Sequence, residues 1–364
     1  MTYTKYLFLM ALIFTFLTSV GQVKDRFAVI AYYAGNRPAQ VDSFAAEKLT
    51  HIIFSFSHLK GNQLHINNQK DSAVIEKLVG LKQRNPSLKV LLSLGGWGGC
   101  ETCSSVFSSA ESRDSFATSV KELTSYFKTD GLDLDWEYPA IEGYPGHLYQ
   151  PDDKPNFTAL VSQLRKTMGK KFLLTFAAGG FKDYIDRSIE WKKVIAQIDL
   201  VNIMTYDLVN GFSKVTGHHT PLYNTSTQKE SVDNAVSMLI KAGVPRRKLV
   251  IGAAFYGRMW EEVAIENNGL YQAGNFKAGI PYRLFSSQLS PDSGFIYRWD
   301  EVAQAPYIYH PEQKLFITYD DKRSVALKAK YVKKKKLGGI MFWQLTEDTY
   351  EEGLLSAIDH EQGK

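Results

Sequence analysis

The sequence has few of the residues on which several classes of protein depend. Only two of its 364 residues are cysteine, and the formal net charge is +5. A charge this small does not indicate nucleic acid as a partner. Hydrophobic residues make up 44% and charged residues 22% of the chain, which is ordinary for a globular protein with room for one large domain.

The sequence also lacks an apolar run long enough to span a membrane. A short run at residues 7–17 follows Lys5 and precedes the small residues at 18–21. This pattern predicts a signal peptide over residues 1–21 with cleavage before Gln22, and a signal anchor is the alternative. We therefore expect a secreted or periplasmic protein that leaves the membrane after signal cleavage, and we expect a monomer.

The two cysteines, Cys100 and Cys103, lie in a glycine-rich loop. In an exported protein such a pair predicts a local disulfide that stiffens the loop. A redox motif would require the pair at a helix start within a different βαβ pattern. A zinc site would require two further ligands, and none lies nearby in the sequence.

Apolar segments rich in β-branched and aromatic residues recur along the chain, with helical stretches between them. We count about eight, at residues 27–33, 51–56, 90–94, 132–136, 172–177, 200–204, 249–254 and 340–343. Eight parallel strands close a barrel. The sequence therefore predicts an α/β fold, a (β/α)8 TIM barrel built from residues 22–257 and 318–364.

Two of the spacers have the apolar period of an amphipathic helix. One stripe begins at Phe157 behind Asn156, a favourable N-cap residue, and a similar stripe begins at Val232. We expect both helices to pack on the outside of the barrel.

The interval between the seventh and eighth apolar segments is about 85 residues long, far more than a helix and two loops require. Residues 258–317 within it are rich in tyrosine, phenylalanine, glycine and turn residues, with short β-like runs at 278–284 and 295–299. This composition predicts a small α+β insertion subdomain, and its aromatic content argues against a disordered insert.

Residues 130–139 read Asp-Gly-Leu-Asp-Leu-Asp-Trp-Glu-Tyr-Pro. Asp133, Asp135 and Glu137 alternate, so a strand places all three on one face, roughly 6.5–7 Å apart. Pro139 ends the strand, which places Glu137 at the carboxyl end of the strand, at the mouth of the site. Crowded carboxylates raise one another's pKa, so one proton is shared and a general acid results. A metal site or a chance acidic strand is the alternative, but unpaired buried acids are too costly to keep without a use.

The segment Asp130-Gly131-x-Asp133-x-Asp135-Trp136-Glu137 resembles the signature of the family 18 glycoside hydrolases, the chitinase family, at every signature position. The resemblance implies that Glu137 protonates the glycosidic oxygen and later acts as a base. It implies that the 2-acetamido carbonyl of the substrate attacks the anomeric carbon, so that configuration is retained without an enzyme nucleophile. Asp135 would turn between the inner acid and the acetamido N–H, and Asp133 would hold the shared proton. No metal and no cofactor are implied.

Later segments match other motifs of that family. Met204-Thr205-Tyr206-Asp207 resembles its Met-x-Tyr-Asp motif, in which the tyrosine donates to the acetamido oxygen and the aspartate contacts sugar hydroxyls. Trp343 matches the residue beneath the sugar that is cleaved. Arg258 matches the arginine that opens the insertion, where it would bind sugar oxygens or pair with Asp207. The resemblance adds further candidate contacts to the substrate: Tyr32, Phe56, Trp97, Tyr138 and Met204. Core packing is the alternative for Tyr32 and Phe56, and Tyr206 without its motif could equally be a core tyrosine.

These observations favour a chitinase that hydrolyses β-1,4-N-acetylglucosamine linkages in chitin or chito-oligosaccharides. An endo-β-N-acetylglucosaminidase acting on N-glycans would use the same acids, but the insertion and the Trp-Glu-Tyr-Pro segment favour chitin. A chitin-binding lectin of the same fold usually has the terminal glutamate replaced, whereas Glu137 is present.

Overall fold

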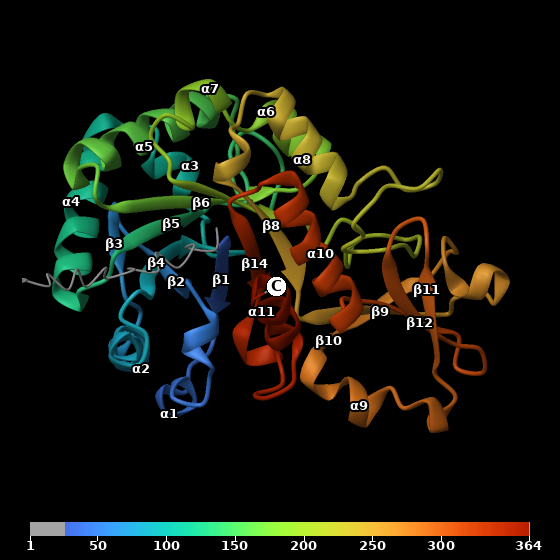
Figure 1. Cartoon of the computed structure of the whole chain (residues 1–364). Helices are drawn as coiled ribbons and strands as arrows, with labels where there is room; N and C mark the ends of the chain where they lie inside the picture. Colours follow the sequence, from blue (N-terminus) through green and yellow to red (C-terminus); the bar gives the residue numbers. More distant parts are fainter. Residues whose placement is uncertain (1–25, 364) are drawn as a thin grey trace, which may run out of the picture.

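The computed structural model describes residues 26–363, and the predicted signal segment lies outside them. Within these residues eight parallel strands form the predicted TIM barrel (Figure 1). The strands run β1-β14-β8-β7-β6-β5-β4-β2 around the wall, and the pairing of β1 with β2 closes it. Their bounds are β1 (Ala28–Tyr33), β2 (His51–Lys60), β4 (Lys89–Gly95), β5 (Gly131–Asp135), β6 (Leu173–Gly179), β7 (Leu200–Met204), β8 (Leu249–Ala254) and β14 (Gly339–Trp343). A short strand, β3 (Gln63–His65), pairs antiparallel with the end of β2.

Helices cover the outside of the barrel (Figure 1). They are α1 (Pro38–Val41), α2 (Gln69–Gly80), α3 (Cys103–Val106), α4 (Ala110–Phe127), α5 (Asp153–Met168), α6 (Lys182–Arg187), α7 (Trp191–Val194), α8 (Val232–Lys241), α10 (Lys322–Lys335) and α11 (Leu354–Gly363). In the described part of the chain, no helix has both the length and the apolar character that crossing a membrane requires.

The start of α5 differs from the prediction. The apolar stripe predicts Asn156 as the N-cap, and this is wrong: the N-cap is Asp152, and the helix begins at Asp153. Pro155 lies in its first turn, where a missing N–H leaves no intrahelical bond unmade. Polar residues therefore extend this helix by about one turn ahead of its apolar stripe.

Apolar side chains form two layers, one on each side of the barrel wall. The outer layer joins Leu132 and Leu134 of β5 to Phe157 of α5 and to the other covering helices. The inner layer is a small cluster inside the barrel that includes Ile30 and Met341. Buried polar side chains share the barrel interior with this cluster, among them Ser93, Asp133 and Thr175.

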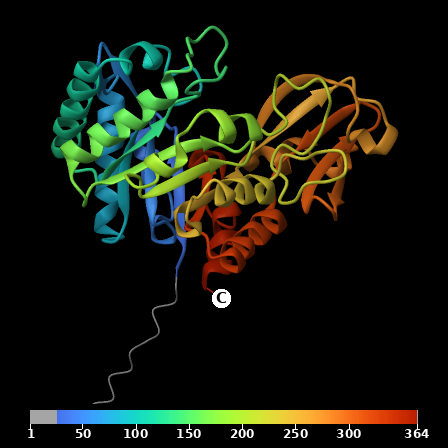
Figure 2. The ribbon, with the colours of Figure 1, turned by 90° about the horizontal axis from the view of Figure 1, so that it is seen from above.

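The predicted insertion is a small antiparallel sheet beside the barrel (Figure 2). The chain leaves the carboxyl end of β8 and enters this sheet after one residue, Phe255. The strand order is β10-β9-β13-β12-β11, with bounds β9 (Tyr256–Glu261), β10 (Asn275–Pro281), β11 (Ile296–Asp300), β12 (Ala305–His310) and β13 (Leu315–Thr318), and a short helix α9 (Phe285–Gln288). Two apolar clusters of its own hold the sheet together. Because it starts where β8 ends, it stands at the carboxyl end of the barrel strands.

Candidate active site

The acids of β5 lie at increasing height in the barrel. Asp133 is 0% and Asp135 is 4% exposed, while Glu137 lies two residues beyond the end of the strand and is partly exposed. Leu132 and Leu134 belong to the outer apolar layer. The acids therefore point into the barrel, as the alternation predicts.

Asp133 is surrounded by hydrogen-bond donors at the bottom of this row. Its Oδ2 accepts from the hydroxyls of Tyr32 and Ser93, each at 3.0 Å. Its Oδ1 accepts from Thr175 Oγ1 at 2.6 Å and from Asn202 Nδ2 at 3.1 Å. Ser93, Asp133 and Thr175 are register partners in three neighbouring strands, which brings them to one level of the barrel. Burial raises the pKa of this carboxyl, and the four donors offset part of that rise.

Asp135 and Glu137 open into a cavity above Asp133. Burial raises the pKa of Asp135 well above its usual range, and Glu137 and Asp133 raise it further. Oδ1 of Asp135 is buried and accepts no hydrogen bond from the described residues. A shared proton is therefore favoured on Asp135, rather than on Asp133 as the sequence suggested. Burial also raises the pKa of Glu137 to about 7, while the Tyr138 hydroxyl lowers it and Asp207 raises it. Below that pH the pair retains a general acid.

Asp207 and Arg258 form an ion pair on another wall of the cavity. Asp207 accepts from Nε of Arg258 at 2.8 Å and from Nη2 at 2.5 Å. Burial alone would raise the pKa of Asp207, but His219 and Arg258 hold it well below its usual range. Asp207 is therefore held as an anion whose charge Arg258 balances. Of the two roles predicted for Arg258, the structure shows the pairing with Asp207.

Tyr206 presents a hydroxyl to the same cavity. Burial raises the pKa of this phenol well above its usual range, and Asp135 and Glu137 raise it further. Its oxygen lies 3.9 Å from Sδ of Met341, which is a weak acceptor. The hydroxyl therefore stays protonated and can donate to a ligand oxygen.

An aromatic floor lies below the cavity. The rings of Phe56 and Trp343 stack with centroids 5.5 Å apart and planes inclined by 15°. Tyr32 lies beside Trp343, with ring centroids 5.9 Å apart, but it is only 1% exposed and its hydroxyl is used by Asp133. The structure thus places Tyr32 behind the floor, in keeping with core packing. A flat aromatic surface suits the apolar face of a sugar ring.

The cavity has a volume of about 950 Å³. Ten of the predicted site residues line it: Phe56, Trp97, Asp135, Glu137, Tyr138, Met204, Tyr206, Asp207, Arg258 and Trp343. Asp133 and Tyr32 lie deeper in the barrel. Residues of the insertion complete the wall, so the insertion extends the cavity beyond the barrel strands.

Trp97 stands on the rim and is 48% exposed. Its ring lies 5.5 Å from that of Tyr144 and 6.2 Å from that of Phe212, measured between centroids. The turn before it depends on Gly95, whose φ is +110°, and a Cβ there would lie 2.2 Å from the carbonyl oxygen of Asp135. This close approach fixes the loop against β5. Contact of Trp97 with a sugar stays a prediction.

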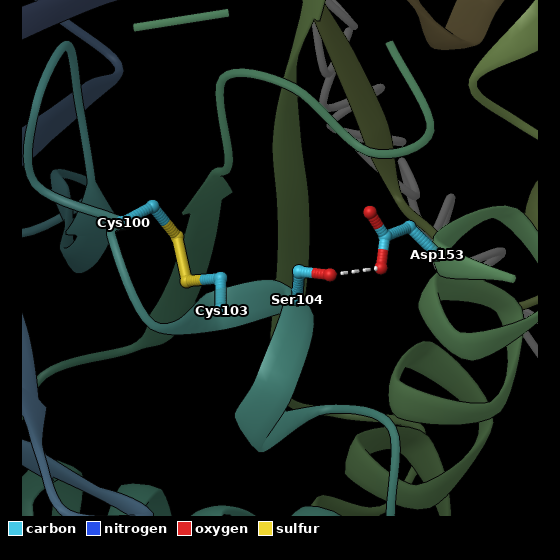
Figure 3. The surroundings of a disulfide bond; sticks show 4 residues. All are labelled: Cys100, Cys103, Ser104 and Asp153. Carbon is cyan, nitrogen blue, oxygen red and sulfur yellow. Dashed lines mark hydrogen bonds between the residues drawn. A yellow bond between two sulfur atoms is a disulfide. The ribbon is translucent and has the colours of Figure 1, made fainter. Parts of the chain in front are cut away.

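Cys100 and Cys103 form the predicted disulfide in that loop, with Cα atoms 5.2 Å apart (Figure 3). The next residue, Ser104, donates its hydroxyl to Oδ1 of Asp153 at 2.7 Å (Figure 3). The loop after β4 is therefore attached to the first residue of α5.

Asp153 also holds the loop that follows the acidic strand. Its Oδ2 accepts from the backbone N–H of Gln150 at 2.7 Å and from that of Ala140 at 3.3 Å. Asp153 is completely buried. One carboxylate therefore joins two rim loops to a helix of the barrel.

The sequence did not single out several residues that line the cavity. Tyr256 opens β9, and the guanidinium of Arg258 lies 5.0 Å from the centroid of its ring. Phe212 lies in a long loop without periodicity, and Glu347 lies in a short turn after β14. Tyr256 alternates with Arg258, and this spacing could have predicted that both side chains face the cavity. Phe212 and Glu347 belong to no periodic pattern that could have predicted their positions.

Three non-proline cis peptide bonds also went unpredicted. They follow Ser55, Glu137 and Trp343, each in or next to a residue that lines the cavity. Such bonds are rare outside proline and have no signature in composition or periodicity.

Comparison with known proteins gives concordant findings. The family described as "Glycosyl hydrolases family 18" matches residues 28–348. "Chitinase A1" of Niallia circulans is 32% identical over 91% of this chain, and the chain spans 58% of the length of that protein. "Chitinase B" of Serratia marcescens is 30% identical over 86% of this chain and 76% of its own length. A solved family 18 N-acetylglucosaminidase from Paenibacillus barengoltzii is 36% identical, with a TM-score of 0.83 over 92% of this chain and 99% of that one.

Proposed function

The chain belongs to the glycosyl hydrolases of family 18, and from this we propose that it is a chitinase-type enzyme. Its substrates would be chitin or chito-oligosaccharides, in which it hydrolyses β-1,4 linkages between N-acetylglucosamine units with retention of configuration. Glu137 would be the general acid and base. Relatives at about 30% identity that carry the name chitinase support this reading.

The observation that carries the proposal is the state of the carboxylates around Glu137. Asp133 is fully buried and accepts four hydrogen bonds from the protein. Asp207 is held by Arg258. Burial and the neighbouring acids raise the pKa of Asp135, which favours its protonated form. The protein thus engages Asp133 and Asp207, and Asp135 has a raised pKa, which favours a nucleophile supplied by the substrate.

The 2-acetamido group can supply this nucleophile. A sugar stacked on Trp343 would bring its acetamido carbonyl oxygen to the Tyr206 hydroxyl, which would hold the carbonyl beneath C1. The proton shared by the acid pair would pass to Glu137 as Asp135 accepts a hydrogen bond from the acetamido N–H. Asp135 would then be ionised and would stabilise the positive charge that develops on the oxazoline ring.

The reaction would proceed in two displacements at C1. In the first, the carbonyl oxygen forms a bond to C1, the bond from C1 to the glycosidic oxygen breaks, and Glu137 gives its proton to that oxygen. In the second, the ionised Glu137 takes a proton from water, whose oxygen bonds to C1 as the bond to the carbonyl oxygen breaks. Two inversions give net retention, and Glu137 regains its proton.

A second candidate activity is the release of single N-acetylglucosamine units. The solved N-acetylglucosaminidase of this family matches nearly its whole length to this chain and supports this alternative. Products from a hexasaccharide distinguish the two: a chitinase gives mainly oligosaccharides at early times, whereas the alternative gives the monosaccharide from the start.

The test of the proposed chemistry uses Glu137→Gln together with the anomer released. The variant should lose hydrolysis of a chromogenic chitobioside by at least 10³-fold, in the upper range for loss of a general acid, yet bind chito-oligosaccharides in calorimetry. NMR of the native reaction should show the β-anomer first. Hydrolysis of a plain glucoside at a comparable rate, or early α-anomer, would contradict attack by the acetamido group.

Export of the protein is part of the proposal. The disulfide between Cys100 and Cys103 supports an oxidising compartment, and it agrees with the signal peptide expected at residues 1–21.

A further inference from the structure

Glu347 is a carboxylate in the cavity that the mechanism above does not use. It ends a short helical turn (Leu345–Glu347) that begins two residues after Trp343. It lines the cavity together with Ile280 and Pro281 of the insertion. Its Oε2 is buried, and no group within residues 26–363 donates a hydrogen bond to it. A buried carboxylate oxygen without a hydrogen-bond donor lowers the stability of the fold, and a ligand that supplied the donor would remove this cost.

The two arginines near Glu347 are committed to other partners. Arg258 is bound in a two-bond contact with Asp207. Arg283 donates from Nε to the backbone oxygen of Thr346 at 3.1 Å. Both guanidinium groups lower the pKa of Glu347, but their hydrogen bonds go to other groups.

The turn that presents Glu347 is fixed from both sides. Oε1 of Gln344 accepts from the backbone N–H of Thr346 at 3.0 Å. Asp348 accepts from the backbone N–H groups of Leu354 and Leu355, each at 2.9 Å. Because its neighbours are anchored, the carboxylate of Glu347 is held in place before any ligand arrives, which lowers the entropy cost of binding.

The position of Glu347 relative to Glu137 defines which sugar it can reach. Glu137 must face the leaving-group oxygen, and its neighbour Tyr138 lies next to the rim residue Trp97, with ring centroids 6.5 Å apart. That end of the cavity therefore belongs to the leaving group. Glu347 lies in the turn after the floor residue Trp343 and lines the cavity together with the insertion. The sugars before the cleaved bond would extend over this side.

We propose that Glu347 binds the second sugar of the non-reducing side, accepting hydrogen bonds from its hydroxyl or amide N–H groups. The residue would thereby select substrates with at least two sugar units before the cleaved bond. This inference rests on the proposed function and deepens it, because it makes disaccharides or longer products the preferred ones.

The acidity of Glu347 is consistent with this role. Burial raises its pKa to about 7, against the lowering effect of Arg258 and Arg283, while Asp207 raises it. The ionised acceptor is therefore fully present only above that pH. The preference for a second sugar should increase as the pH rises from about 6 to about 8.

The experiment compares chromogenic glycosides that carry one or two N-acetylglucosamine units. We expect the ratio of kcat/KM for the two-unit substrate to that for the one-unit substrate to fall by roughly 10- to 100-fold in Glu347→Ala, with the change mainly in KM. Glu347→Gln should lose part of that ratio, because one acceptor oxygen remains, and it should lose the pH dependence of the ratio. Glu352→Gln, an exposed carboxylate five residues later, is the matched control and should behave as the native protein.

The outcomes separate this inference from the proposed function. If the native protein hydrolyses neither substrate, the proposed function fails. If it hydrolyses them but the ratio is the same in the native protein and in both Glu347 variants, the inference fails and the function stands. Should Glu347→Ala fold poorly, calorimetry of the free disaccharide with Glu137→Gln and with Glu137→Gln/Glu347→Gln decides the matter. Equal affinity in the two would overturn the inference, and weaker binding in the second would support it.

Discussion

Replacing Tyr138 with phenylalanine should extend the proposed activity to higher pH. The Tyr138 hydroxyl stabilises the ionised form of Glu137 and so lowers a pKa that burial raises to about 7. The ring itself packs against Phe181 and Tyr184, with centroids 5.5 and 5.3 Å away. Phenylalanine keeps these contacts and removes only the oxygen, so the expected effect is on the acid and not on the packing.

The size of the shift follows from the worth of one hydrogen bond to a charged group. Such a bond contributes about 1.5–3 kcal/mol, and one pKa unit corresponds to about 1.4 kcal/mol. Because Glu137 is partly exposed, we use the lower end, about one unit. The midpoint of the alkaline limb should then move from about 7 to about 8, and the protonated fraction at pH 8 should rise from about one tenth to about one half. Relative activity at that pH therefore increases about fivefold.

The measurement is kcat/KM for a chromogenic disaccharide glycoside between about pH 5 and pH 9, since this parameter reports the free enzyme. Tyr144→Phe, on the same rim but not among the groups that shift the acidity of Glu137, is the control and should leave the limb in place. Asp207→Asn should move the limb the other way, because Asp207 raises the pKa of Glu137. An unchanged limb in Tyr138→Phe, or a shift to lower pH, would refute the reasoning.

Two further predictions concern stability. Folding raises the pKa of Glu137 from 4.5 to about 7, so ionisation of this carboxyl destabilises the folded state increasingly as the pH rises from about 4.5 to about 7. Glu137→Gln removes this cost. The variant should therefore have a free energy of unfolding that is higher by about 1–3 kcal/mol at pH 8 and by much less at pH 5. Urea denaturation at both pH values checks this, and an equal gain at both would count against it. Asp153→Asn places an amide N–H₂ against groups that donate to the carboxylate and should lower the free energy of unfolding by about 2 kcal/mol. The exposed neighbour variant Asp152→Asn should cost little, and equal losses in the two would disprove the role of Asp153.

The barrel was predictable because its signals are periodic. Eight apolar segments in a chain of this length admit few arrangements, and the alternation of Asp133, Asp135 and Glu137 fixed the face on which the acids lie. The insertion was predictable from an interval too long for one helix. The start of α5 was not, because its first turn is polar and contains Pro155, so hydrophobic period alone locates the helix about one turn late.

The surroundings of the acids were less predictable than the acids themselves. Ser93, Thr175 and Asn202 are single polar residues within apolar strands, and only the register of neighbouring strands brings them to Asp133. The shared proton was predicted on Asp133, the deepest acid, whereas the hydrogen bonds to Asp133 and the raised pKa of Asp135 favour Asp135 as its site. Residues in aperiodic loops, such as Phe212, take their positions from packing between distant segments, which no local pattern encodes.

The four groups that donate to Asp133 come from β1, β4, β6 and β7, and Asp133 itself lies on β5. Five of the eight strands thus meet at one carboxylate below the cavity. If any one of these strands separated from the wall on heating, at least one of those bonds would break and the acids above would lose their alignment. We therefore expect thermal loss of the proposed activity to coincide with opening of the barrel, and we expect substitutions at this level to change both heat resistance and the acidity of the carboxylates above.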